Sequence, residues 1–291
     1  MSIQCESIGV NYKGFIDVPS SDSLVNQLHE EGHIDIPELV FPIYQNMYVE
    51  LTGSEGHTGL ARVKGDQLVK FSFPKKSKQI GIKPKNREQV YALDALLDPS
   101  ISLVVLSGGP GVGKTILAIA GALNGYEKKI YKKIILSKPM TQITKNKMGA
   151  LPGELSEKFN PYLRNYLSNF QQLMGDHVSI NDLAGPLQVE FLPVQMFLGS
   201  SFVNTFLVID EAQGLTKSEL GALITRVGEG SKMVILGDLL QLHEPIEPKQ
   251  QGLRVAINDE RFKQAEFVAT IELAKCERSP LARLAGEIFE V

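Results

Sequence analysis

The chain has 291 residues, which is enough for a large hydrophobic core and one or two domains. Its apolar content of 43% is that of an ordinary globular protein, and its formal net charge of −3 excludes a polycation. No apolar run approaches the ~20 residues that a membrane-spanning helix needs. The two cysteines, Cys5 and Cys276, have no metal-like spacing, and the first residues lack a signal segment, so a cytoplasmic protein with reduced thiols is expected.

Because the whole chain is slightly acidic, a nucleic-acid ligand would have to bind local basic segments. Residues 75–87 and 128–147 each contain several lysines and no Asp or Glu. Charge alone does not separate a binding surface from an ordinary solvated surface, so both interpretations stay open at this point.

Residues 1–80 contain short apolar runs separated by turn residues, which is typical of a small, mainly β N-terminal domain. A short helix is expected at 24–28 with Ser23 as its cap, and a linker at 73–78. Strands are expected in the runs 38–44, 47–51, 59–63 and 67–73, with hairpin loops at 52–56 and 64–66.

Residues 81–291 follow a different pattern, in which apolar strands alternate with helices. This pattern predicts an α/β domain whose parallel sheet is flanked by helices on both faces, with its sites at the carboxyl ends of the strands. Strands are expected at 101–106, 134–136, 189–194, 206–209, 233–236 and 268–273. Helices are expected at 87–97, 114–124, 154–174 with a break or new start at Pro161, and 217–227 with Thr216 as its cap.

A phosphate-binding loop follows the strand predicted at 101–106. Gly108, Gly113, Lys114 and Thr115 satisfy the pattern G-x-x-x-x-G-K-[ST], with an apolar helix directly after it. Glycines let several backbone N–H groups point at one phosphate, and the helix start adds its positive dipole end. Lys114 can reach the β- and γ-phosphates. The predicted nucleotide contacts are Gly108, Gly109, Pro110, Gly111, Val112, Gly113, Lys114, Thr115 and Ile116.

An acidic pair, Asp210 and Glu211, directly follows the buried run 206–209. Thr115 and Asp210 are the predicted Mg²⁺ ligands, because Mg²⁺ prefers hard oxygen donors. Glu211 is placed to orient an attacking water and take its proton.

The segment 233–242 repeats this design, with Gly237, Asp238 and Gln241 after an apolar strand. Asp238 can orient a water or a basic partner near the nucleotide, and Gln241 can hydrogen-bond the γ-phosphate or its water. Gln89, which precedes the P-loop strand, can present its amide to an adenine edge.

Two arginines, Arg226 and Arg278, are candidates to stabilise charge in the transition state, and structural ion pairs are the alternative for both. The five histidines form no metal-ligand pattern, so they are expected to be ordinary structural or surface residues.

The motif Asp-Glu-Ala-Gln at 210–213, followed by Gly-Asp-x-x-Gln-Leu at 237–242, resembles the superfamily 1 helicases. The stretches 81–89, 151–164, 223–238 and 277–285 narrow the resemblance to the PhoH family of ATPases, over residues 81–291. Two features depart from the family: its Arg-Gly-Arg stretch is replaced by Met-Phe-Leu-Gly-Ser-Ser-Phe at 196–202, and its Arg-Pro is Lys138-Pro139 here.

The resemblance implies a RecA-like core that binds ATP and Mg²⁺ and corresponds to one of the two motor domains of a helicase. It also implies a homo-oligomer, such as a hexameric ring, in which a neighbour completes each nucleotide site. Arg278 matches the helicase arginine that approaches the γ-phosphate. Residues 1–80 resemble the segment between nuclease and ATPase in PIN–PhoH proteins, and no PIN nuclease activity is expected here.

The sequence therefore predicts an ATPase that hydrolyses ATP with Mg²⁺ and couples hydrolysis to translocation on, or remodelling of, RNA or single-stranded DNA. The alternative, from another class, is a nucleotide-switched oligomeric scaffold for a protein partner. A GTPase is disfavoured, because in place of a guanine-reading Asn-Lys-x-Asp motif the chain has only Lys145-Asn146-Lys147.

Overall fold

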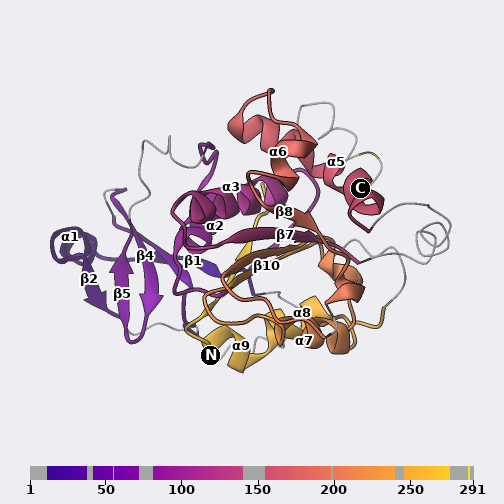
Figure 1. The fold of residues 1–291 in the computed structure, drawn as a ribbon. Helices are drawn as coiled ribbons and strands as arrows, with labels where there is room; N and C mark the ends of the chain where they lie inside the picture. Colours follow the sequence, from indigo (N-terminus) through magenta and orange to yellow (C-terminus); the bar gives the residue numbers. More distant parts are fainter. Residues whose placement is uncertain are drawn as a thin grey trace.

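Two β-sheets organise the chain (Figure 1). The structure is a computed structural model that describes residues 12–37, 42–54, 56–71, 81–139, 155–197, 199–239, 246–275 and 288. No helix within these described ranges is both long enough and apolar enough to cross a membrane.

The N-terminal sheet has five strands in the order β1-β3-β4-β5-β2, and helix α1 (Asp22–Glu31) packs beside it. The strands are β1 (Phe15–Pro19), β2 (His33–Asp35), β3 (Tyr48–Thr52), β4 (Thr58–Lys64) and β5 (Gln67–Lys70). β3, β4 and β5 confirm three of the expected strands, whereas β1 and β2 were not expected. The cap of α1 is Ser21 rather than Ser23, because the Ser21 hydroxyl accepts the Leu24 N–H. Most of the run 38–44 and the linker 73–78 lie outside the described residues.

The larger sheet has six parallel strands in the order β11-β6-β10-β9-β7-β8. They are β6 (Leu103–Ser107), β7 (Lys133–Ser137), β8 (Val189–Phe191), β9 (Thr205–Ile209), β10 (Lys232–Gly237) and β11 (Val268–Glu272). β6 lies between β11 and β10, with Val104 opposite both Ala269 and Val234. All six predicted strands are present, within two or three residues of their expected ends.

Helices cover both faces of this sheet (Figure 1). Side chains alternate between the faces, so Val104 and Leu106 meet one helical layer while Leu103 and Val105 meet the other. The first layer contains α2 (Arg87–Leu97), α3 (Lys114–Glu127) and α5 (Leu155–Met174), and the second contains α7 (Lys217–Ile224) and α8 (Gly252–Asn258). The predicted α/β class is thus confirmed.

Several details of the helices differ from expectation. Helix α5 runs through Pro161 as one helix of 20 residues, without the expected break. Helix α7 is capped by Thr216 as expected but ends at Ile224, three residues early. The short helices α6 (Ile180–Ala184) and α9 (Glu260–Gln264) and the 3₁₀ turns Val194–Met196 and Ala212–Gly214 were not expected, because such short pieces carry little periodic signal.

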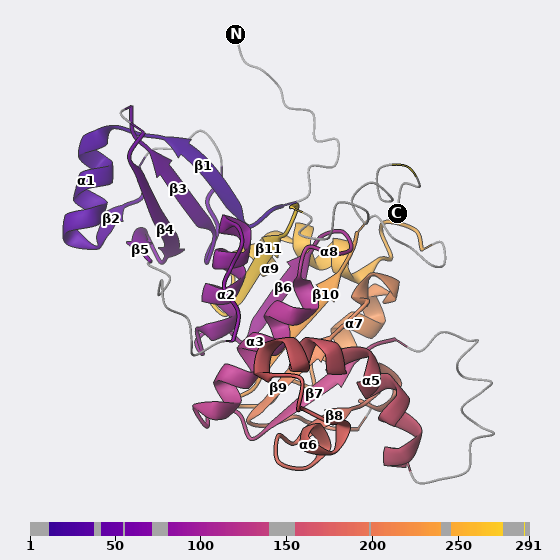
Figure 2. The ribbon, with the colours of Figure 1, turned by 90° about the horizontal axis from the view of Figure 1, so that it is seen from above.

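The N-terminal sheet packs against α2 and the edge strand β11 (Figure 2). Tyr48 stacks on Tyr91 of α2 with ring centroids 4.7 Å apart, and Asn46 donates to the carbonyls of Glu266 and Val268 at 2.7 and 2.9 Å. Gly14 has a φ of +80°, and a Cβ there would lie 1.5 Å from the Thr270 carbonyl oxygen, so only glycine allows this approach. The division of the chain at residue 80 stays a prediction.

Lys232, at the start of β10, fixes the last turn of α2. Its side chain is fully buried, and its Nζ donates to the carbonyls of Ala95, Leu96 and Asp98 at 2.8–2.9 Å. These carbonyls lack partners within the helix, and the negative end of the helix dipole favours a cation there. Burial nevertheless lowers the pKa of Lys232 to about 7.

Because Lys232 is buried, we expect the free energy of unfolding to rise with pH. Above pH 7 Lys232 loses its proton in the folded chain but keeps it in the unfolded chain, whose lysine pKa is 10.5. The unfolded state then binds more protons, so raising the pH favours the folded state. Between pH 7 and pH 9 the chain should gain about 2 kcal/mol of unfolding free energy relative to Lys232→Met. Urea unfolding at both pH values measures this, and identical changes in the two proteins would contradict it.

Candidate active site

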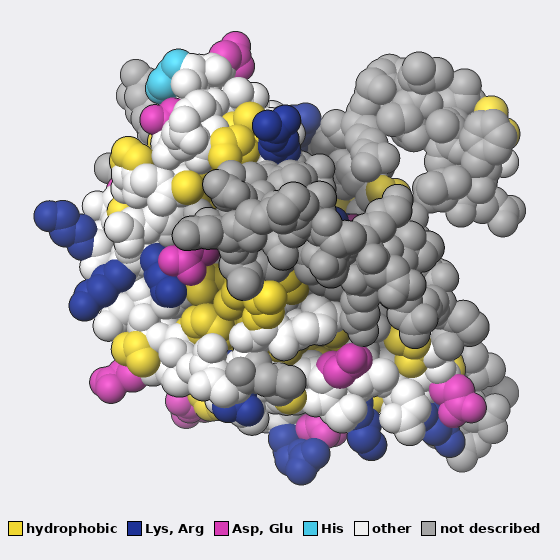
Figure 3. Space-filling model, turned by 45° about the vertical axis from the view of Figure 1, so that its right-hand side comes forward, with side chains coloured by type: hydrophobic (Ala, Val, Ile, Leu, Met, Phe, Trp, Pro, Cys, Tyr) yellow, Lys and Arg dark blue, Asp and Glu magenta, His cyan; other side chains and the backbone are white. Residues whose placement is uncertain are grey.

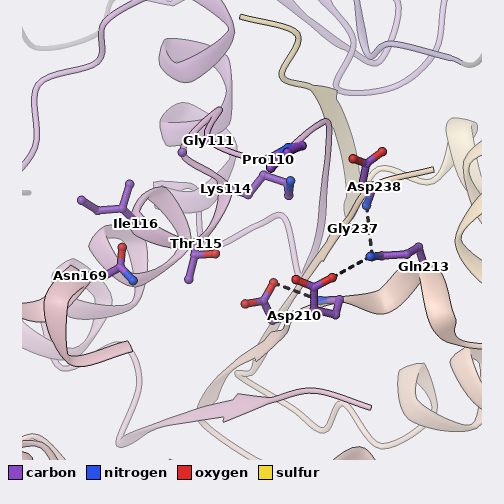
Figure 4. Close-up of a pocket in the computed structure, with 12 residues that line it drawn as sticks. Pro110, Gly111, Lys114, Thr115, Ile116, Asn169, Asp210, Gln213, Gly237 and Asp238 are labelled. Atoms are coloured by element: carbon purple, nitrogen blue, oxygen red, sulfur yellow. Dashed lines mark hydrogen bonds between the residues drawn. The ribbon is translucent and has the colours of Figure 1, made fainter. Parts of the chain in front are cut away.

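A pocket of about 290 Å³ opens where β6, β9 and β10 end (Figure 4). It brings the P-loop together with both acidic segments, as the sequence predicts for the carboxyl ends of parallel strands. Its lining residues are Pro110, Gly111, Gly113, Lys114, Thr115, Ile116, Asn169, Asp210, Glu211, Gln213, Gly237 and Asp238.

The P-loop connects β6 to α3, and three of its glycines adopt positive φ: Gly108 (+142°), Gly111 (+81°) and Gly113 (+96°). At Gly108 a Cβ would lie 2.1 Å from the Leu273 carbonyl oxygen, so no larger residue fits beside β11. The Lys114 ammonium donates to the carbonyls of Gly108 and Gly109. The loop therefore curls around its own lysine, which lies at the pocket.

Asp210 and Glu211 follow the end of β9. The Asp210 N–H donates to the Ser137 carbonyl of β7 at 2.7 Å, and one Asp210 oxygen accepts from the Tyr166 hydroxyl at 3.3 Å. Glu211 has a φ of +57°, an uncommon conformation for a residue with a side chain, and strain of this kind is often found at functional sites. Burial, and then the charge of Glu211, raise the pKa of Asp210.

Gln213 connects the two acidic segments. Its side chain is 1% exposed, its Nε2 donates to a Glu211 carboxylate oxygen at 2.7 Å, and its Oε1 accepts the Asp238 N–H at 3.2 Å (Figure 4). A Cβ on Gly237 would lie 3.2 Å from the same Oε1, so glycine at 237 leaves room for this amide. The position of Glu211 is therefore linked to the end of β10.

The donor set of the pocket fits a Mg²⁺ ion that is shared with a nucleotide. The hydroxyl of Thr115 and the carboxylate of Asp210 line the same space, and Mg²⁺ in such sites takes one or two protein oxygens plus phosphate oxygens and water. A cation there would also offset the repulsion that raises the Asp210 pKa. Clusters of three or more His, Cys, Asp or Glu suited to a metal are absent from the described part of the chain.

Gln89 is buried beside the P-loop, and its amide is engaged with the protein itself. Its Nε2 donates to the Val112 carbonyl at 3.1 Å, and its Oε1 accepts the Lys85 N–H at 2.9 Å. In this arrangement Gln89 holds the loop, so its predicted contact with an adenine edge would require these two bonds to change. That contact stays a prediction.

The other predicted site residues lie elsewhere. Arg226 lines a separate cavity of about 170 Å³, together with Val194, Phe197 and Leu223, and the main pocket does not include it. Its role in charge stabilisation stays a prediction that would need the nucleotide of another subunit. Gln241 and Arg278 lie outside the described residues.

Three residues at the site were not predicted from the sequence: Gln213 and Asn169, which line the pocket, and Tyr166, which bonds to Asp210. Gln213 lies inside the motif that identified the acidic pair, two residues after Glu211, so its position offered a signal. Tyr166 and Asn169 are three residues apart on α5 and therefore share a helix face, but no local motif marks them.

The two basic segments are only partly free to bind an anion. Lys133 pairs with Glu190 at 3.5 Å, and Arg87 pairs with Asp17 and Glu50. On the face shown in Figure 3, Lys and Arg side chains lie interspersed with Asp and Glu side chains. The residues described from these segments therefore include cations that the protein itself neutralises.

The family model and the similar proteins that match this chain carry the same family name. A family model described as PhoH-like protein matches residues 81–290. Protein PhoH2 of Bacillus subtilis is 36% identical over 290 residues, covering 96% of this chain and 64% of that protein. Protein PhoH2 of Mycolicibacterium smegmatis is 29% identical over 277 residues, covering 94% of this chain and 61% of that protein. The chain thus spans somewhat less than two thirds of the length of these relatives.

Among solved structures, the Pif1 helicase from Candida albicans is similar with a TM-score of 0.38 and 16% identity, covering 72% of this chain and 44% of that one. We draw neither fold nor function from this similarity. The family match, the parallel sheet and the P-loop after β6 together confirm the expected RecA-like P-loop fold.

Proposed function

Because the chain belongs to the PhoH family, we propose that it hydrolyses ATP with Mg²⁺ and couples hydrolysis to movement along, or remodelling of, RNA or single-stranded DNA. The observation that carries this proposal is a single pocket that gathers Lys114 and Thr115 with Asp210 and Glu211. These are the charge-stabilising, metal-binding and proton-accepting groups that phosphoryl transfer to water needs.

Each group has a defined task in this proposal. The loop amides and Lys114 bind the phosphates, after the Lys114 ammonium leaves the carbonyls of Gly108 and Gly109. Thr115 and Asp210 hold Mg²⁺, which supplies positive charge to the phosphate oxygens. Glu211, oriented by Gln213, accepts the proton of the attacking water.

Asp238 and Gln241 sense whether the γ-phosphate is present, and the bond from Asp238 to Gln213 offers a route from that sensor to Glu211. We further propose a cytoplasmic homo-oligomer, such as a hexameric ring, in which Arg226 or Arg278 of one subunit acts at the site of the next. The separate location of Arg226 is compatible with that arrangement.

A second function is favoured by the charges. Internal ion pairs neutralise Arg87 and Lys133, and the net charge of the chain is −3. A nucleotide-switched scaffold that assembles with ATP and binds a protein partner needs no basic track. It would use the same pocket.

Steady-state Mg²⁺-dependent ATP turnover, with and without single-stranded RNA or DNA, separates the two functions. Stimulation by one polymer, lost as salt is raised, would support the motor and identify its track. Turnover that neither polymer changes would favour the scaffold. Absence of any turnover above a Lys114→Ala blank would contradict the ATPase itself.

Gln213 provides a specific test of the link between the acidic segments. Gln213→Glu places a second carboxylate against Glu211 and removes the donor that orients it. We expect turnover to fall roughly 10-fold while ATP binding is kept, because the general base is misplaced rather than lost. Turnover and calorimetric ATP binding of this variant check the expectation, and unchanged turnover would show that Glu211 does not depend on this amide.

A further inference from the structure

The first turn of α2 meets three different parts of the molecule through three consecutive residues. Arg87 contacts the N-terminal sheet, Glu88 contacts the chain that leaves β11, and Gln89 contacts the P-loop. This turn therefore lies at a junction between the N-terminal sheet and the pocket.

Arg87 is held by carboxylates from two strands of the N-terminal sheet. Its guanidinium donates to both oxygens of Asp17 in β1, at 2.6 and 2.9 Å, and to Glu50 in β3 at 2.7 Å. A cation at the start of a helix is opposed by the helix dipole. The position of Arg87 in this turn thus depends on its two carboxylate partners, which belong to the N-terminal sheet.

The next two residues of this turn connect it to the segment after β11 and to the P-loop. The Glu88 carboxylate accepts the N–H groups of Ala274 and Lys275 at 2.8 and 3.3 Å, just after β11. Gln89 donates to the Val112 carbonyl in the P-loop and is 4% exposed. A helix turn is stiff, so a shift of Arg87 moves Glu88 and Gln89 with it.

We propose that Arg87 is a positioning residue through which the N-terminal sheet holds the P-loop and the exit of β11 in place. The N-terminal sheet is then a working part of the pocket rather than a separate appendage. The inference rests on the proposed function only for what the P-loop binds, since the contacts themselves need no nucleotide.

Hydrogen exchange without nucleotide tests the proposal in the full chain. Arg87→Ala should raise amide exchange at least ~5-fold in peptides covering residues 108–117 and 272–275, because their anchoring turn is loosened. Amide exchange in peptides of β4 should stay unchanged, because Arg62 and Tyr48 still bind Asp94 near the other end of α2. Lys133→Ala, which breaks an ion pair between β7 and β8, is the matched control and should leave the P-loop peptides unchanged.

Two further variants sharpen the test. Asp17→Asn with Glu50→Gln should reproduce the effect, and adding Arg87→Ala to that pair should change little more. Arg87→Lys should be intermediate, because lysine keeps the charge but loses the paired geometry. Unchanged exchange at 108–117 in Arg87→Ala, or an equal rise in β4, would overturn the proposal.

A separate readout keeps this inference distinct from the proposed function. ATP binding, measured by calorimetry, should weaken roughly 5-fold in Arg87→Ala but not in Lys133→Ala, as expected when a preformed phosphate loop becomes mobile. If the unmodified chain binds no ATP, the proposed function fails, and the exchange experiment still decides the role of Arg87.

Discussion

Glu211→Gln should leave ATP binding intact while slowing turnover at least ~10²-fold, the loss expected when a general base is removed. The exchange is nearly isosteric. The amide oxygen of the new residue can still accept the hydrogen bond from Gln213, so the link to Asp238 is kept and only the basicity of the side chain is lost. Steady-state turnover and calorimetric ATP binding of the variant are the two measurements.

A carboxylate outside the pocket provides the control for this experiment. Glu190 in β8 pairs with Lys133 at the surface, and Glu190→Gln should bind and turn over ATP as the unmodified chain does. Near-normal turnover by Glu211→Gln would remove Glu211 from the role of base. Loss of ATP binding by the same variant would also count against it, because a residue needed only for proton transfer should not be needed for affinity.

The sequence was a good guide wherever a local pattern determines local structure. Six apolar runs became the six parallel strands, and the P-loop pattern located three glycines with positive φ next to Lys114. The rule that sites lie at the carboxyl ends of strands correctly predicted that Asp210 and Asp238 lie at one pocket with Lys114. These features depend on the spacing of apolar residues, on the residue types in turns and on the order of strands and helices along the chain. All three can be recognised in a single sequence.

The features that sequence analysis missed depend on contacts between segments far apart in the chain. Tyr166 reaches Asp210 from α5, and its hydroxyl could not be assigned a partner without the fold. The bond from Gln89 to Val112 likewise arises because the turn that carries Gln89 packs against the loop, and the predicted contact of Gln89 with an adenine edge stays a prediction. The strand β1 was missed because its parallel pairing with β3 requires a crossover connection, which no turn motif indicates.

Arg62→Ala should destabilise the chain strongly, lowering the unfolding free energy by about 3 kcal/mol. Arg62, in β4, is 3% exposed; it bonds at 2.8 Å to Asp94 in the last turn of α2, and also to Asp98, the residue directly after the helix. Tyr48 donates to the same Asp94 oxygen at 2.9 Å. Removing the arginine leaves two half-buried carboxylates without their main cation, and burial penalises each of them.

The pH dependence of this loss identifies its cause. Although burial opposes it, hydrogen bonds from Ser100 and Arg62 hold the pKa of Asp98 well below its ordinary value of 3.8. The stabilisation is therefore present above that value and is lost as the pH falls toward the lower folded pKa, so the difference between the two proteins should shrink in acid. Lys64→Ala is the control, because Lys64 lies 3.7 Å from Asp98 but is 50% exposed, and it should cost no more than ~0.5 kcal/mol. Urea unfolding of the unmodified chain and the two variants at neutral and acid pH measures these differences. Equal losses of unfolding free energy in Arg62→Ala and Lys64→Ala, or a loss in Arg62→Ala that is independent of pH, would show that the buried ion pairs do not hold the N-terminal sheet on α2.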